Sequence, residues 1–211
     1  MEIHKLGHCC LKIEEQGVVI LTDPGAWTTL PEMAEGVDVV LITHEHLDHL
    51  HIPSLKQVLV QSPKALVITN SSVGKILNQE GIKHELLADN QNRTINGVLL
   101  EGFGDKHAQI YPSVSPVENT GYLIANRFFY PGDAFYNPGK QVEILALPVS
   151  GPWMKLAEAI DFAKKLAPKF CFPVHDGMLK FLGSVHLLPE KELKAAGINF
   201  SVIKEGESQQ F

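Results

Sequence analysis

Three histidines and an aspartate gather in the segment His44-Glu45-His46-Leu47-Asp48-His49. The segment follows an apolar run, residues 37–42, which predicts a buried strand. Alternate side chains of an extended chain point the same way, so His44 and His46 can converge on one point. Asp48 and His49 follow where the chain must turn and can face a second point. The spacing therefore favours a loop that supplies ligands to two neighbouring metal ions over a solvated polar loop.

Three more polar residues follow predicted strands: His107 after residues 97–103, Asp133 after residues 127–130, and His175 after residues 170–174. Loops at strand ends are where a scaffold commonly holds functional groups. A single histidine near a turn is more often a surface or core residue than a ligand. These three residues therefore gain weight only when they are considered together with the first segment.

The elements that must position these residues come in two runs of strands, each followed by alternating strands and helices. A hairpin is predicted over 10–14 and 17–21, and helices are predicted to begin near Pro53 and Ser71. A helical face spans 153–167, and a last helix spans 190–196. The remaining predicted strands are 37–43, 65–69, 83–87, 92–95, 97–103, 108–110, 118–125, 127–130, 142–147, 170–174 and 200–203.

Length and composition bound the architecture. The chain has 211 residues, of which 45% are hydrophobic and 20% charged, so it can bury a sizeable core. We expect one domain over residues 1–211, or two intimately packed halves. The polar end, residues 205–210, is the stretch whose composition favours disorder.

Location and partners follow from composition as well. No apolar run approaches the ~18 residues of a membrane span, and the start shows no signal-peptide pattern. Three cysteines, two of them adjacent, do not make a disulfide framework, so we expect a cytoplasmic protein without membrane partners. The net charge of −6 argues against nucleic acid. Bound divalent ions would add local positive charge, so a small, anionic substrate stays open.

Taken together, these residues resemble the metallo-β-lactamase-fold superfamily of metal-dependent hydrolases. The similarity covers the His44–His49 motif, His107, Gly132-Asp133 and Val174-His175. The chain further resembles a compact branch that includes ascorbate-phosphate lactonase-like proteins. This similarity lies at Gly7-His8, Thr22-Asp23-Pro24 and Glu118-Asn119-Thr120-Gly121-Tyr122. The resemblance implies an α+β fold, a four-layer αββα sandwich with the metal cleft at the edge between the two sheets.

The resemblance also implies a role for each residue. The first ion would be held by His44, His46 and His107, the second by Asp48, His49 and His175, and Asp133 would bridge both. Such nitrogen- and oxygen-rich sites suit two divalent ions, zinc first, with manganese or iron as alternatives. We expect Asp48 and Asp133 to be the catalytic carboxylates, with Asp48 orienting the nucleophile or returning a proton.

The implied reaction is hydrolysis by a hydroxide that bridges the two metal ions, on a small ester, lactone or phosphoester. Antibiotic hydrolysis is disfavoured, because β-lactamases of this fold usually lack a histidine at the His49 position and often carry cysteine for the bridging aspartate. Oxygen chemistry is disfavoured because His46 is not a carboxylate. A phosphodiesterase or nuclease of the same fold is the first alternative, with scattered Lys106, Lys140, Lys155 and Lys180 as its cations. A non-catalytic metal-binding or ligand-sensing module is the second alternative.

Several residues keep two interpretations. His8, Trp27, Asn119 and Trp153 are candidates for the walls of the cleft, and each has an ordinary structural alternative. Asp23 is either a partner that orients a ligand histidine or a turn-forming residue before proline. The three cysteines, Cys9, Cys10 and Cys171, are interpreted as small buried hydrophobes.

Overall fold

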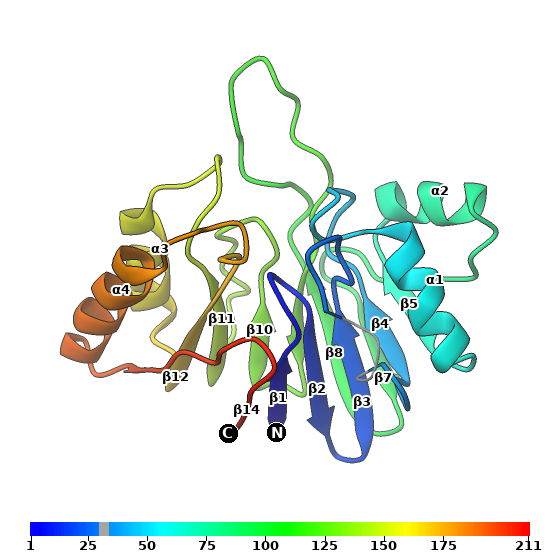
Figure 1. Ribbon diagram of the computed structural model, residues 1–211, viewed down its shortest axis with the longest axis horizontal. Coiled ribbons are helices and arrows are strands. Elements are labelled where there is room, and N and C mark those ends of the chain that lie inside the picture. Colours follow the sequence, from blue (N-terminus) through cyan, green and yellow to red (C-terminus); the bar gives the residue numbers. More distant parts are fainter. Residues whose placement is uncertain (30–33) are drawn as a thin grey trace.

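The computed structural model describes residues 1–29 and 34–211. Within these residues two seven-stranded sheets face each other, with helices on both outer sides (Figure 1). The first sheet has the order β14 (Ser208–Gln210), β1 (Glu2–Lys5), β2 (Leu11–Glu15), β3 (Val18–Thr22), β4 (Val39–Leu41), β5 (Leu66–Thr69), β6 (Glu85–Leu86). The second has the order β13 (Asn199–Phe200), β12 (Phe170–Val174), β11 (Ile144–Pro148), β10 (Phe128–Tyr130), β9 (Gly121–Ile124), β8 (Val98–Phe103), β7 (Asn92–Ile95).

The helices complete four layers in the order αββα, as expected. The first sheet is covered by α1 (Ile52–Gln61) and α2 (Ser71–Gln79), and the second by α3 (Leu156–Leu166) and α4 (Gly183–Ala195) (Figure 1). None of the helices formed by the described residues is long and apolar enough to cross a bilayer.

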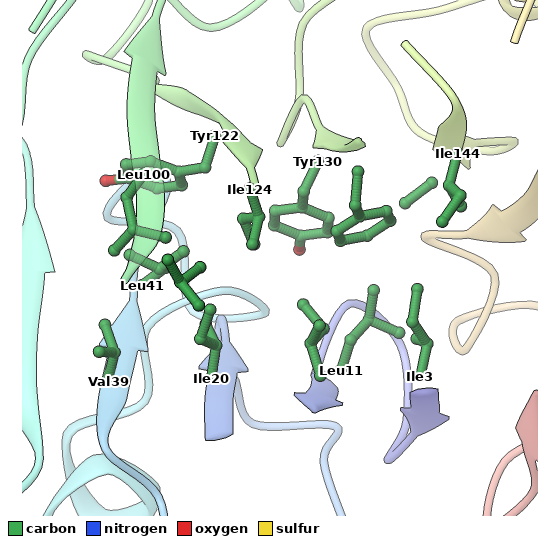
Figure 2. Packing of buried hydrophobic residues seen from close by; sticks show 14 of the residues in the cluster. Ile3, Leu11, Ile20, Val39, Leu41, Leu100, Tyr122, Ile124, Tyr130 and Ile144 are labelled. Atoms are coloured by element: carbon green, nitrogen blue, oxygen red, sulfur yellow. The ribbon is translucent and has the colours of Figure 1, made fainter. Parts of the chain in front are cut away.

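The continuous apolar runs of the central strands arise because both faces of each sheet are covered. In β4, Val39 and Leu41 point into the layer between the sheets, while Val40 packs beneath the helices. Figure 2 shows side chains of β1 to β4 meeting those of β8 to β11 in this central layer. Buried on two sides, such strands lose the alternation of polar and apolar residues that a half-exposed strand shows.

Strand direction brings the predicted site residues to one end of the sandwich. In the first sheet β3, β4 and β5 run parallel, and in the second β10, β11 and β12 do so. Parallel neighbours end at the same edge, where α/β sheets hold their ligands. Asp23 and the His44–His49 loop therefore follow one set of strand ends, and Asp133 and His175 follow the other.

The main elements agree with the sequence-based prediction, including the hairpin whose turn residues Gln16 and Gly17 both have positive φ. The predicted strand 108–110 is wrong: residues 104–120 form a long loop that projects beyond the sheets (Figure 1). Ile110 is exposed there, and none of the strands among the described residues pairs with it. The predicted disorder at 205–210 is also wrong for β14, which pairs antiparallel with the unpredicted β1. Helix α4 begins at Gly183, ahead of the predicted residue 190.

Candidate metal centre

Asp23 fixes the histidine-rich loop to the end of the first sheet. Its Oδ1 accepts a hydrogen bond from the backbone N–H of Thr43 at 2.8 Å, and its Oδ2 accepts from the Thr43 hydroxyl at 2.7 Å. The same Oδ2 lies 2.7 Å from His49 Nδ1 and 2.7 Å from the Tyr130 hydroxyl. Asp23 is completely buried. It is therefore the orienting partner of a site histidine, the first of its two interpretations.

Asp133 is presented from the second sheet by a tight turn after β10. Its backbone N–H donates to Asn119 Oδ1 at 3.1 Å, and Asn119 Nδ2 donates to the Pro131 carbonyl at 3.0 Å. The preceding Gly132 has φ +63°, and a Cβ there would lie 2.4 Å from Asn119 Oδ1. Asn119 thus shapes the Asp133 turn and lies behind the site.

His107 and His175 approach Asp133 from two further loops. His107 belongs to the long loop of residues 104–120, which is tied to Asp133 by the Ala108 N–H to Asp133 carbonyl bond of 2.8 Å. His175 follows β12 and has φ +60°, a conformation that costs a non-glycine residue free energy. Its N–H donates to the His8 carbonyl at 3.0 Å, and the Ser150 hydroxyl donates to its carbonyl. These contacts hold the strained residue in place.

All seven predicted metal-binding residues come together around Asp133. Its Oδ2 lies 3.0 Å from His175 Nε2, 3.3 Å from His107 Nε2 and 3.9 Å from His44 Nε2. Its Oδ1 lies 3.2 Å from His49 Nε2. Asp133 is therefore placed between the histidines of the two predicted sets.

Each of the two sets also has contacts among its own members. His46 Nδ1 lies 3.2 Å from His44 Nε2, and ligand atoms of His44, His46, His107 and Asp133 all lie within 4.8 Å of one another. On the other side, Asp48 Oδ2 lies 3.5 Å from His175 Nε2 and 3.9 Å from His49 Nε2. Each set is compact enough to surround one cation.

The hydrogen bonds of the histidines direct free lone pairs at this centre. His49 Nδ1 faces Asp23, and His44 Nδ1 lies 3.0 Å from the Thr43 hydroxyl, which already donates to Asp23. Both Nδ1 atoms must therefore donate, which leaves Nε2 with a lone pair. His107 Nδ1 likewise faces the Ala108 carbonyl, an acceptor. This is the arrangement by which proteins set the tautomer of metal-binding histidines.

Several of these inward atoms are buried without a hydrogen bond of acceptable geometry within the described residues. They are His49 Nε2, His107 Nε2, His175 Nε2 and Asp133 Oδ1. Buried polar atoms are rarely left in this state, because each costs the free energy of its lost hydration. A cation between them would satisfy all of them at once, so the residues present fit a metal centre.

The protonation states of Asp133, Asp48 and His44 also suit cation binding, whereas the pKa values of His49 and His175 are lowered by burial but raised overall by the facing Cys9 and Asp133. Burial raises the pKa of Asp133, but the facing His49 and His175 hold it well below its ordinary value. Burial also raises the pKa of Asp48, and the contacts with His8 and the site histidines lower it to about 2. Burial lowers the pKa of His44 well below its ordinary value. At neutral pH both carboxylates are charged and His44 is neutral, as metal ligands must be.

Trp153 and Trp27 have different positions. Trp153 is buried and its Nε1 donates to Asp133 Oδ2 at 2.8 Å, while its ring contacts His107 edge-on at 5.8 Å between centroids. Trp27 is 46% exposed and its ring contacts His8 edge-on at 5.0 Å. Trp153 therefore acts on Asp133 directly, and Trp27 borders the site through His8.

Cys9 and His8 were not among the predicted ligands, yet both lie beside the second set. Ligand atoms of His8, Cys9, His49 and His175 fall within 4.8 Å of one another. Cys9 is buried in the hydrophobic central layer, as interpreted, and its Sγ lies in addition beside these histidines. The available signal was strand alternation, because Cys9 faces the central layer together with Leu11, while Cys10 faces the helices.

A second ion pair network supports the chain after His175. Lys5 Nζ lies 2.7 Å from Asp176 Oδ1 and donates to the Pro173 carbonyl at 3.1 Å. His186 Nε2 lies 2.8 Å from Asp176 Oδ2. Sequence analysis missed this network because its members lie in β1, in α4 and in the loop after β12.

The four-layer fold and the histidine-rich centre at the strand ends are those of the metallo-β-lactamase fold. Residues 2–175 match the family described as the Beta-lactamase superfamily domain, and the chain belongs to this family. The resemblance drawn from the motif residues, and the αββα sandwich that it implied, are thus confirmed.

Individual relatives span most of the chain. Protein Rv0786c of Mycobacterium tuberculosis is 33% identical over 189 residues, 85% of each chain. A protein of Methanocaldococcus jannaschii named a metal-dependent hydrolase is 27% identical over 219 residues, 95% of this chain and 96% of that protein. The structure of Igni18, described as a novel metallo hydrolase from Ignicoccus hospitalis, has a TM-score of 0.80 at 21% identity and covers 100% of this chain and 98% of that chain.

Proposed function

We propose that this metal-dependent hydrolase of the metallo-β-lactamase fold binds two divalent ions and cleaves a small ester, lactone or phosphoester. The observation that carries the proposal is the group of buried, inward-facing nitrogen and oxygen atoms that have no hydrogen bond within the described residues. Two separate groups of ligand atoms are close enough to hold an ion, one with His44, His46, His107 and Asp133 and one that includes His49 and His175, which favours two ions over one.

The first ion would be held by His44, His46 and His107, the second by Asp48, His49 and His175, with Asp133 between them. This donor set suits zinc, and also manganese or iron. When bound, such ions lower the pKa of a water molecule toward neutrality and polarise a carbonyl or phosphoryl oxygen of the substrate. Two cations also offset the acidic net charge locally, so the substrate can be anionic.

Side chains of the protein orient Asp133, and Asp48 can transfer a proton. The Trp153 indole donates to the Asp133 carboxylate and Asn119 accepts from the Asp133 backbone N–H, so both the side chain and the backbone of Asp133 are restrained. The Asp48 side chain is 17% exposed, compared with 4% for Asp133. Asp48 is therefore the carboxylate that can meet solvent and substrate, accept the proton of the attacking water and return it to the leaving group.

A substrate panel tests the proposal. Metal-replete protein is assayed on lactones, para-nitrophenyl esters and bis-para-nitrophenyl phosphate, and metal content is measured on the same sample. We expect hydrolysis of at least one class, abolished by chelator and by His46→Ala or Asp133→Ala, with His4→Ala on β1 as the matched control. Activity that survives chelation or these variants would refute the assignment of the site.

The same panel separates the alternatives. Turnover of the phosphodiester alone would favour a phosphodiesterase, although Lys140 is engaged with Glu101 and offers little free charge to a nucleic acid. Bound metal with no turnover of any substrate would favour a metal-binding or sensing module. The lactonase-like interpretation rests on the resemblance at Gly7-His8, Thr22-Asp23-Pro24 and residues 118–122, and preferential lactone turnover is its specific outcome.

A further inference from the structure

His8 differs from other histidines of the centre in the direction of its hydrogen bond. The backbone N–H of Gly177 donates to His8 Nδ1 at 3.0 Å. A neutral imidazole has one donor and one acceptor nitrogen, so an accepting Nδ1 places the hydrogen on Nε2. In His49 the order is reversed, because its Nδ1 donates to Asp23 and its Nε2 keeps the lone pair.

The local fold enforces this orientation. The His8 N–H donates to the Trp27 carbonyl at 3.4 Å, and the His8 carbonyl accepts from the His175 N–H at 3.0 Å. The His8 ring lies against the rings of Trp27 and His175. A Cβ on Gly177 would lie 3.1 Å from the Cα and Cβ of His8, so any larger residue there would crowd His8. The backbone of three segments thus fixes which ring nitrogen faces inward.

The inward Nε2–H of His8 faces the carboxylate of Asp48. His8 is 1% exposed, and its Nε2 makes no hydrogen bond of good geometry within the described residues. Asp48 Oδ2 lies 3.3 Å away. Buried N–H groups rarely stay unpaired, and Asp48 Oδ2 is an acceptor within reach of this one.

We propose that His8 is a positioning residue that holds the Asp48 carboxylate through its Nε2–H and is not itself a metal ligand. The proposal rests on the two-ion site proposed above. His8 lies close enough to His49 and His175 to be counted with a ligand set, but a protonated Nε2 has no lone pair to offer a metal. Held by His8, Asp48 keeps one orientation toward the second ion and the substrate.

The tautomer can be measured directly in the protein as it exists. Imidazole ¹⁵N–¹H correlation spectra of uniformly labelled, metal-free protein report which ring nitrogen carries the hydrogen, and the spectrum of His8→Gln identifies the His8 signals. We expect an Nε2–H form that persists when zinc is added. An Nδ1–H form, or a His8 Nε2 that becomes metal-bound with zinc, would overturn the proposal. This result does not depend on any hydrolytic activity, so it stands apart from the proposed function.

Variants test the positioning role. His8→Phe keeps a ring without a donor, whereas His8→Gln keeps an N–H close to the Nε2 position. We expect His8→Phe to bind as much zinc as wild type and to lose about 10–100-fold in kcat/KM, with most of the loss restored in His8→Gln. His4→Phe and His4→Gln, on the neighbouring β1, are the matched controls.

A double mutant identifies the partner. If His8 acts through Asp48, His8→Phe should lower kcat/KM by less than about 2-fold in an Asp48→Asn background, because the interaction is already gone. Equal losses in both backgrounds, equal losses in the Phe and Gln variants, or a lower zinc content in His8→Phe would each contradict the positioning role. Should His8→Phe fail to fold, the spectra of the wild-type protein still decide the tautomer.

Discussion

Replacing Asp23 by asparagine is expected to lower both stability and metal affinity, although Asp23 is not itself a predicted metal ligand. Four donors converge on this buried carboxylate: the N–H and hydroxyl of Thr43, His49 Nδ1 and the Tyr130 hydroxyl. An amide has only one acceptor oxygen. Whichever way it is turned, its NH2 group faces at least one of these donors.

The magnitude follows from these contacts. One unsatisfied buried donor costs about 1–3 kcal/mol, and losing the charge weakens the bonds that remain. We therefore expect Asp23→Asn to lower the free energy of unfolding by about 2–5 kcal/mol, near the range for breaking a buried pair. His49 also loses the acceptor that fixes its tautomer, so metal affinity should fall about 10–100-fold.

The assay combines urea unfolding of metal-free protein with zinc titration against a chromophoric chelator. Asp38→Asn is the matched control, because Asp38 accepts a single backbone hydrogen bond, from Val19 at 2.9 Å, far from the centre. It should cost about 0.5–1.5 kcal/mol and leave zinc affinity unchanged. If Asp23→Asn were no more harmful than this control, the role assigned to Asp23 would be wrong.

Three further changes have expected outcomes. Gly132→Ala should cost about 2–3 kcal/mol in thermal or urea unfolding, because its Cβ has no room, whereas Gly139→Ala, at φ +66° with nothing within 4 Å, should cost about 1 kcal/mol. Trp153→Phe keeps an aromatic ring but removes the donor to Asp133, so kcat should fall about 10–100-fold and the free energy of unfolding by about 1–3 kcal/mol; an unchanged kcat would contradict this contact. In chelator-treated protein burial depresses the pKa of His44, so the unfolded chain binds a proton near pH 6.5 that the folded chain does not bind, and the contribution of His44 to stability falls as the pH drops below about 6.5. The raised pKa values of His8, His49 and His175 contribute in the opposite direction. His44→Gln should therefore make stability fall less steeply, or rise more steeply, as the pH drops through this range than in the wild type, and an unchanged slope would refute the depressed pKa.

Much of the fold could be predicted because hydrophobic patterning is a local signal. The hairpin around Gln16-Gly17 and the buried strands that precede the His44 and His175 loops follow from runs of about five residues. The pairing of β1 with β14 could not be predicted in this way. Its partners lie at opposite ends of the chain, as in the Glu2–Gln210 pair, and neither strand is apolar enough to stand out. Pairing of this kind depends on the assembled sheet, because β1 becomes the edge strand with which β14 pairs.

The failed strand at 108–110 has a different cause. Its alternation was real but short, and an alternating segment becomes a strand only where a neighbour offers hydrogen bonds. The loop of residues 104–120 instead uses its backbone to carry His107, through the His107 N–H to Val117 carbonyl bond of 2.9 Å and the Ala108 bond to Asp133. The segment whose strand prediction failed, residues 108–110, therefore belongs to the loop that holds His107 at the site. Failures of local prediction are expected at such functional segments.

Residue types were sufficient to find the centre, but they could not tell a ligand from its neighbour. His8 and His49 are both buried histidines beside Asp48, and in sequence they carry the same chemistry. What separates them is the group opposite Nδ1: a carboxylate from the end of β3 for His49, and a backbone N–H from the loop after β12 for His8. An acceptor opposite Nδ1 leaves Nε2 with a lone pair that can bind a metal ion, whereas a donor opposite Nδ1 leaves Nε2 with a hydrogen. The αββα sandwich brings the carboxylate partner of His49 and the backbone N–H partner of His8 to the same edge. Tertiary structure therefore decides which nitrogen of each histidine carries the hydrogen.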